Sequence, residues 1–453
     1  MFDLLVKNGR IVDDDRVYYG NIYVKDGKIA LISERNIEFE SADVVDACDK
    51  LILPGVVDAH MHIGEYNADF EDIQTSTMAA AAGGVTTCID MPLNLYSPSV
   101  LTAEAVRLKK RLLSQESFVD FCVWGGLTPQ SIENLNEMHK EGAISFKCFL
   151  SGGGNDFYAP TLGEVRQALM TIKKFDGLAG FHCEDYSIVA YEKERVLKNK
   201  LDGRQAFLNS RPLSCEIIAV RNIIELARET GAKVHICHVS HPDVAKIIEE
   251  AQSEGIDITA ETCVHYLTFT QNDYLKNGCA FGCAPPLRDE NSREGLWNYI
   301  NRGVLSCVVS DHSPGMPENR SDQHQPTYMS GYGISGVQTM LPVFYDGVIK
   351  HGMPVTLAAK CMSSNPAKRW GIYGKKGAVK TGFDADFVIF DDKTEHTICA
   401  DNLFYKVKLT AFDGLKVKGK VEQTFIRGIS VYCNEKIAFK KGFGKFIELE
   451  KQI

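Results

Sequence analysis

The sequence lacks the long apolar run that a membrane-spanning helix needs. No stretch of about 18 consecutive apolar residues occurs anywhere in its 453 residues. The first residues, Met1-Phe2-Asp3, also lack the basic and then apolar pattern of a signal peptide. We therefore expect a cytoplasmic protein with no membrane partner.

A surplus of positive charge and a disulfide-type cysteine pattern are also missing. The 59 acidic residues outnumber the 50 Lys and Arg residues, and the net charge of −9 argues against a nucleic-acid partner. The 14 cysteines are scattered, and no second pair completes a zinc-ribbon spacing with Cys279 and Cys283. Together with the missing secretion pattern, this predicts reduced and mostly buried thiols.

Both ends of the chain have the pattern of short β-strands joined by tight turns. Asn8-Gly9 and Asp26-Gly27 lie between apolar stretches and predict hairpins. Near the other end, short apolar runs at 386–390, 424–426 and 431–432 alternate with glycines. Neither end has enough strands for a stable sheet of its own. We therefore expect residues 1–54 and 375–453 to form one small β-sandwich domain.

Residues 55–374 alternate between apolar runs and amphipathic segments. Eight runs have the length of a strand, at 56–62, 85–91, 121–127, 144–150, 178–183, 233–239, 256–263 and 305–310. The segments between them carry apolar residues at i, i+3 and i+4, and several end in glycine, which predicts helices. This order predicts an α/β fold, a (β/α)₈ TIM barrel. An open doubly wound sheet ranks lower because no glycine-rich dinucleotide loop follows the first strand.

Good metal ligands follow the apolar runs at the end where a barrel carries its active site. His60 and His62 are two apart, so in a strand they project from the same face. His182, His238 and Asp311 stand at the ends of later runs. A single histidine at a strand end is usually an ordinary core or loop residue, but this many ligands on one rim predict a metal site.

Two further residues refine that prediction. His235 and His238 are three apart and should face opposite sides of a strand, and we choose His238 because it lies nearer the C-terminal end. Lys147 lies inside an apolar run. Burial and nearby positive charge favour its neutral amine, which can react with CO₂ to form an anionic carbamate. A carbamate has two oxygens and can bridge two ions, so Lys147 predicts a two-metal site.

These strand-end residues and the segment 377–388 resemble the amidohydrolase superfamily over essentially the whole chain. Within it the chain resembles the cyclic amidases: allantoinases, hydantoinases or dihydropyrimidinases, and dihydroorotases. Dihydroorotases carry an arginine at the position of Gly64, and hydantoinases a tyrosine at the position of Gly152. The segments 91–94, 261–266, 311–314 and 333–338 are similar to allantoinases, although Val264 replaces an expected proline and Ala284 an expected serine.

The resemblance implies an enzyme with two divalent metal ions, zinc first, with cobalt, manganese or iron as alternatives. His60, His62 and Asp311 would hold one ion, His182 and His238 the other, with carboxylated Lys147 and a hydroxide bridging them. Asp311 would act as general base and acid while (S)-allantoin opens to allantoate in purine breakdown; the alternative is another hydantoin or a dihydropyrimidine ring. Asn94, Gly152, Ala284 and Gly333 would contact the substrate, and a homotetramer is expected. Relatives that serve as scaffolds have lost ligands, whereas this chain keeps all six.

Overall fold

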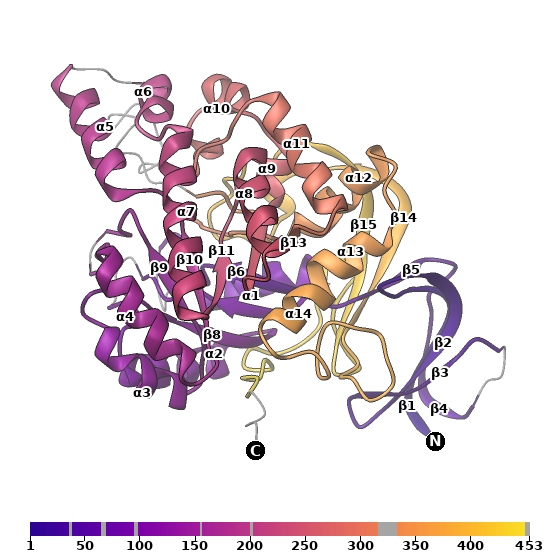
Figure 1. Ribbon diagram of the computed structural model, residues 1–453. Helices are drawn as coiled ribbons and strands as arrows, with labels where there is room; N and C mark the ends of the chain where they lie inside the picture. Colours follow the sequence, from indigo (N-terminus) through magenta and orange to yellow (C-terminus); the bar gives the residue numbers. More distant parts are fainter. Residues whose placement is uncertain are drawn as a thin grey trace.

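Eight parallel strands form a barrel in the computed structural model, which describes residues 1–35, 39–64, 69–94, 98–154, 156–199, 203–315 and 333–448 (Figure 1). They pair in chain order, and a bridge between Met61 and His312 brings the last strand back to the first. The strands are β6 (Val56–Met61), β7 (Val85–Asp90), β8 (Asp120–Gly126), β9 (Ala143–Phe149), β10 (Leu178–His182), β11 (Lys233–Ile236), β12 (Ile258–Cys263) and β13 (Leu305–Val309). The predicted barrel is confirmed.

Burial on both faces explains why these strands are nearly continuous apolar runs in the sequence. Every residue of β6, β7 and β8 is buried. One face of each strand fills the barrel interior and the other packs against the surrounding helices, as is usual for parallel sheets. The polar residues in these strands are also buried, so each needs a hydrogen-bond partner inside the protein.

Helices follow the strands, and their ends carry the expected caps. Thr161 and Glu164 form a capping box at the start of α4, and Gly231 ends α7 in the left-handed conformation, with φ 64°. The helices are α1 (Ile73–Ala82), α2 (Ala103–Glu116), α3 (Leu135–Lys140), α4 (Leu162–Lys173), α5 (Tyr186–Lys198), α6 (Arg204–Asn209), α7 (Leu213–Thr230), α8 (Pro242–Ser253), α9 (Val264–Thr268), α10 (Gln271–Asn277), α11 (Glu290–Asn301), α12 (Met340–Lys350), α13 (Thr356–Ala359) and α14 (Asn365–Arg369).

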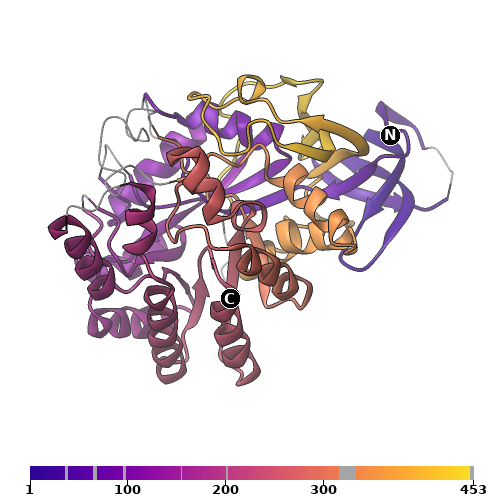
Figure 2. The same ribbon diagram turned by 90° about the horizontal axis from the view of Figure 1, so that it is seen from above.

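Strands from both chain ends form a second sheet of nine strands. β5 pairs antiparallel with β14, and Leu53 lies opposite Val388. In Figures 1 and 2 the indigo N-terminal strands lie beside the orange and yellow C-terminal strands. The strands are β1 (Phe2–Val12), β2 (Val17–Lys25), β3 (Lys28–Ser33), β4 (Ser41–Asp46), β5 (Leu51–Pro54), β14 (Phe387–Thr397), β15 (Lys416–Ile426), β16 (Ile429–Cys433) and β17 (Lys436–Ile437). The prediction that the two ends share one β domain is confirmed.

One of the two predicted hairpin turns is wrong. Asp26-Gly27 does join β2 to β3, with φ values of 51° and 76°. Asn8-Gly9 instead lies inside β1, where Asn8 has φ 57° and the register with β2 shifts between Val6 and Gly9. Asn-Gly fits a bulge as well as a turn because both need a left-handed residue.

A buried ion network joins the terminal sheet to the barrel. Lys376 Nζ lies 2.6 Å from Asp120 Oδ2 at the start of β8 and 2.6 Å from Asp386 Oδ2 beside β14. Arg427 also donates a hydrogen bond to Asp120. Burial works to lower the pKa of Lys376, but the surrounding carboxylates outweigh it and raise that pKa, so the lysine stays charged.

The cysteines are all free thiols, as predicted, and 11 of the 14 are buried. Within the described ranges, no helix is both long and apolar enough to cross a membrane.

Candidate metal centre

The six predicted ligands gather where the barrel strands end. His60 is the second-to-last residue of β6, and His62 follows that strand. Lys147 lies in β9 and His182 is the last residue of β10. His238 follows β11, and Asp311 follows β13. Because parallel strands of a barrel end on one rim, these distant positions meet there. Lys147 has no exposed surface at all.

Two of these side chains, His60 and His62, converge on the carboxylate of Asp311. The Nε2 atoms of His60 and His62 lie 3.3 Å and 3.6 Å from Oδ1 of Asp311. One ligand atom from each of His60, His62 and Asp311 lies within 4.8 Å of the other two, a spacing that could hold a metal ion. Lys147 Nζ lies 3.4 Å from the same Nε2 of His60, so the lysine reaches this group from β9, a strand that does not pair with β6.

His182 and His238 form the second group. Nδ1 of His182 faces Nε2 of His238 at 3.1 Å. The other nitrogen of His182, Nε2, donates to Glu184 at 2.8 Å, and Arg211 donates to the same carboxylate. A neutral histidine that donates through Nε2 has a lone pair on Nδ1. That lone pair points at a second ring nitrogen, and a cation between the two would stabilise the arrangement.

The donor set and its spacing fit divalent metal ions. At metal–nitrogen distances of 2.0–2.1 Å, two ligand atoms of one tetrahedral ion lie roughly 3.3 Å apart. The observed separations of 3.1, 3.3 and 3.6 Å fall close to this value. Imidazole and carboxylate donors suit zinc and other first-row metals.

Two of these residues hold a strained backbone. His238 has φ 38° and Asp311 has φ 44°, in the left-handed region that side-chain-bearing residues seldom adopt. Strain of this kind costs on the order of 1–3 kcal/mol and concentrates at functional sites. His238 lies two residues after Ile236, where β11 ends. The alternation of side chains along a strand therefore does not predict the direction of the His238 side chain. His235 is buried below, where its Nε2 donates to Glu261 at 3.0 Å.

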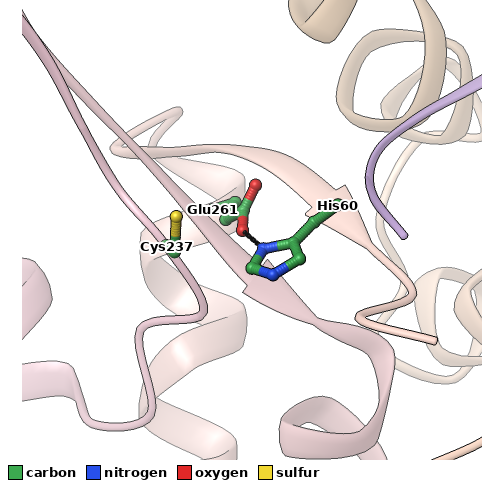
Figure 3. A group of neighbouring side chains, drawn as sticks. All are labelled: His60, Cys237 and Glu261. Carbon is green, nitrogen blue, oxygen red and sulfur yellow. Dashed lines mark hydrogen bonds and ion pairs between the residues drawn. The ribbon is translucent and has the colours of Figure 1, made fainter. Parts of the chain in front are cut away.

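Glu261 is a residue of this site to which the sequence analysis assigned no role. Its carboxylate accepts hydrogen bonds from Nδ1 of His60 and from Nε2 of His235, and it has no exposed surface. Figure 3 shows the carboxylate directed at the His60 ring, with the Cys237 thiol nearby. Accepting the Nδ1 proton leaves the Nε2 lone pair of His60 free for a metal, which is the usual role of a carboxylate behind a ligating histidine. A glutamate inside a largely apolar strand was the available signal in the sequence.

Burial keeps the histidines of the site neutral, which is the form that binds metals. Burial and then the charge of Lys147 lower the pKa of His60 to about 4, and burial first of all lowers the pKa of His182 and His238. Burial also raises the pKa of Asp311 to about 8, a shift that a bound cation would oppose. The protein therefore provides neutral histidine donors and one carboxyl group whose ionised form a bound cation would favour.

The four expected substrate contacts lie in loops around the rim. Asn94 donates to the carbonyl of Pro98 at 2.8 Å, and its own oxygen accepts from Lys109 at 3.3 Å. Gly152 lies in the loop after β9, and Ala284 precedes a cis proline. At Gly333, with φ 134°, an added Cβ would lie 2.5 Å from Ser313 Cβ, so only glycine fits. Their roles in substrate binding stay predictions.

Comparison with known proteins identifies relatives along nearly the whole chain. The pattern of the Amidohydrolase family matches residues 51–431. An allantoinase of Bacillus licheniformis is 34% identical over 98% of this chain and 99% of its own, and one of Bacillus velezensis is 36% identical over 99% and 98%. The solved L-hydantoinase (dihydropyrimidinase) of Arthrobacter aurescens has a TM-score of 0.96 and 31% identity over 99% of this chain and 100% of its own. A solved D-hydantoinase has a TM-score of 0.91 and 27% identity over 98% of both chains.

Proposed function

This chain belongs to the amidohydrolase family, and we propose that it hydrolyses the cyclic amide bond of (S)-allantoin. The product would be allantoate, and the reaction would be a step of purine breakdown. The observation that carries the proposal is the match to two allantoinases along 98% and 99% of this chain. A ring-opening reaction on another hydantoin or on a dihydropyrimidine is the alternative. It is favoured by the likeness to a solved L-hydantoinase (dihydropyrimidinase).

The chain would hold two divalent metal ions, with zinc first and cobalt, manganese or iron as alternatives. His60, His62 and Asp311 are the ligands we assign to one ion, and His182 and His238 those of the other. Lys147, carboxylated by CO₂, would bridge the two. Ions bound here would supply Lewis acidity, which polarises a carbonyl and lowers the pKa of water from about 15.7 towards roughly 7.

Asp311 moves the proton in this reaction. As water adds to the ring carbonyl carbon, Asp311 accepts a proton from the water and passes it to the ring nitrogen as the carbon–nitrogen bond breaks. Oδ1 of Asp311 lies 3.3 Å from Nε2 of His60, and this position within the ligand group supports the role. Glu261 holds His60 in the tautomer that keeps Nε2 free, and Glu184 does the same for Nδ1 of His182.

Groups at or near four loop residues would contact the substrate: Asn94, Gly152, Ala284 and Gly333. Glycine at 152 leaves out the ring that a hydantoinase carries there as tyrosine, and a Cβ added at this position would already contact Ala159 at 3.6 Å. This supports a substrate with an additional side group, such as the ureido group of allantoin. The neighbouring Asn155 lies outside the described residues.

One comparison tests the reaction. The purified protein, loaded with zinc in the presence of bicarbonate, is assayed on allantoin, hydantoin and dihydrouracil. We expect the highest kcat/KM for allantoin. A higher value for hydantoin or dihydrouracil would replace the proposed function with the alternative.

Three further properties are proposed together with the reaction. We expect a homotetramer, which light scattering after size-exclusion chromatography measures directly. We also expect a cytoplasmic location, and a division of the chain into a β-sandwich domain of residues 1–54 and 375–453 and a catalytic barrel of residues 55–374.

A further inference from the structure

His265 is a buried histidine whose two ring nitrogens have no hydrogen-bond partner in the described part of the chain. It lies on α9, directly after β12, and only 1% of its surface is exposed. Among the described residues, neither Nδ1 nor Nε2 has a hydrogen-bond partner. Three other buried histidines differ in this respect, since His60, His182 and His235 each donate to a carboxylate.

Packing alone does not account for this residue. A buried polar group that lacks its hydrogen bond costs about 1–3 kcal/mol, and His265 carries two such atoms. The ring packs on Tyr266, with the two ring centroids 4.4 Å apart, but a phenylalanine could make that contact without the cost. The nitrogens therefore require a partner that the described part of the chain does not supply.

The position of His265 indicates where that partner lies. One ring nitrogen of His265, a carboxylate oxygen of Asp311 and the thiol of Cys263 all lie within 4.8 Å of one another. A single tetrahedral atom that is hydrogen-bonded to two partners holds them roughly 4.7 Å apart. The ring nitrogen of His265 and the carboxylate oxygen of Asp311 are thus close enough for one polar atom to contact both.

The chemistry of this group favours a neutral polar ligand over another metal ion. Burial lowers the pKa of His265 to about 3, so its ring carries one donor and one acceptor at neutral pH. Burial also raises the pKa of the Cys263 thiol, so this cysteine does not offer the thiolate that a metal binds.

We propose that His265 is a catalytic residue that accepts a hydrogen bond from the leaving ring nitrogen while Asp311 delivers a proton to that nitrogen. The inference rests on the proposed function. The leaving nitrogen already carries one hydrogen, which it donates to His265. It gains a second proton from Asp311 as the carbon–nitrogen bond breaks, and His265 keeps its own protonation state throughout. The bond to His265 strengthens as the arriving proton gives the nitrogen positive charge, so it contributes mainly to kcat.

His265→Phe tests the proposal because it removes both nitrogens and keeps an aromatic ring. We expect kcat to fall 10- to 100-fold with KM changed less than about threefold, while two metal ions per chain remain bound. The thermal midpoint should stay the same or rise, because two unpaired polar atoms have left the core. His265→Asn and His265→Gln place an amide oxygen near Nδ1 or Nε2, and one of them should recover part of the lost kcat.

The matched control is His351→Phe. His351 stacks on Trp297 and contacts Glu294 among the outer helices, so its replacement should leave kcat unchanged. Wild-type kcat in His265→Phe, or a lower thermal midpoint with normal kcat, would overturn the inference and leave the proposed function standing. A wild-type protein that opens none of allantoin, hydantoin and dihydrouracil would overturn both.

Discussion

Replacing Glu261 with glutamine should weaken metal binding without unfolding the protein. In the wild type one carboxylate accepts hydrogen bonds from both His60 and His235. A glutamine side chain has one accepting oxygen, and its amide group can only donate to the second ring. If the amide donates to Nδ1 of His60, the ring must carry its proton on Nε2, where the metal would bind.

The size of the effect follows from two independent estimates. Loss of one hydrogen bond to a charged partner costs about 1.5–3 kcal/mol, and loss of a partner behind a ligating histidine lowers metal affinity by about 10- to 100-fold. Since 1.4 kcal/mol corresponds to a factor of ten, the two ranges agree. We therefore expect Glu261→Gln to raise the metal dissociation constant by about 10- to 100-fold.

Competition with a chelating dye, followed by metal analysis of the dialysed protein, measures this change. Glu216→Gln is a matched control, because Glu216 is also buried but is bonded to Ser240 and Arg288. The control should keep wild-type metal affinity even if its stability falls. Equal metal affinity in wild type and Glu261→Gln would refute the role assigned to Glu261.

Three other predictions concern activity, stability and pH. Asp311→Asn should abolish turnover and keep the thermal midpoint, since burial already disfavours the charged carboxylate; measurable turnover would exclude its role in proton transfer. Lys376→Met should lower the unfolding free energy in urea by about 3–5 kcal/mol because it leaves buried carboxylates unpaired, whereas the exposed Lys393→Met should show no measurable change. His265 has a pKa near 6.5 when unfolded and about 3 when folded, so the stability its neutral form provides is complete above pH 6.5 and is lost towards pH 3. The stability of His265→Phe relative to wild type should therefore grow by up to about 1.4 kcal/mol per pH unit below 6.5 in metal-free protein, and a constant difference from pH 7 to 5 would contradict the assigned pKa.

The barrel could be predicted because its strands are buried on both faces. Burial on both faces favours apolar residues at most positions, and the eight resulting runs match the observed strands to within three residues at each end. The hairpin expected at Asn8-Gly9 failed because a left-handed residue serves a turn and a bulge equally well.

The site was only partly predictable. Ligands at strand ends could be assigned because parallel strands of a barrel share one rim, which brings His60 and Asp311 together across some 250 residues of sequence. The supporting role of Glu261 depends on side-chain directions across three strands, and sequence spacing does not contain that information. The unpaired ring of His265 likewise appears only when all of its neighbours are placed.

A crystal structure of the zinc-loaded protein, grown with bicarbonate and measured at the zinc absorption edge, tests the two-metal site most directly. We predict two anomalous peaks, one among His60, His62 and Asp311 and one between His182 and His238, with density for a carbamate on Lys147 between them. A single peak, or a bare lysine beside two occupied sites, would contradict the account.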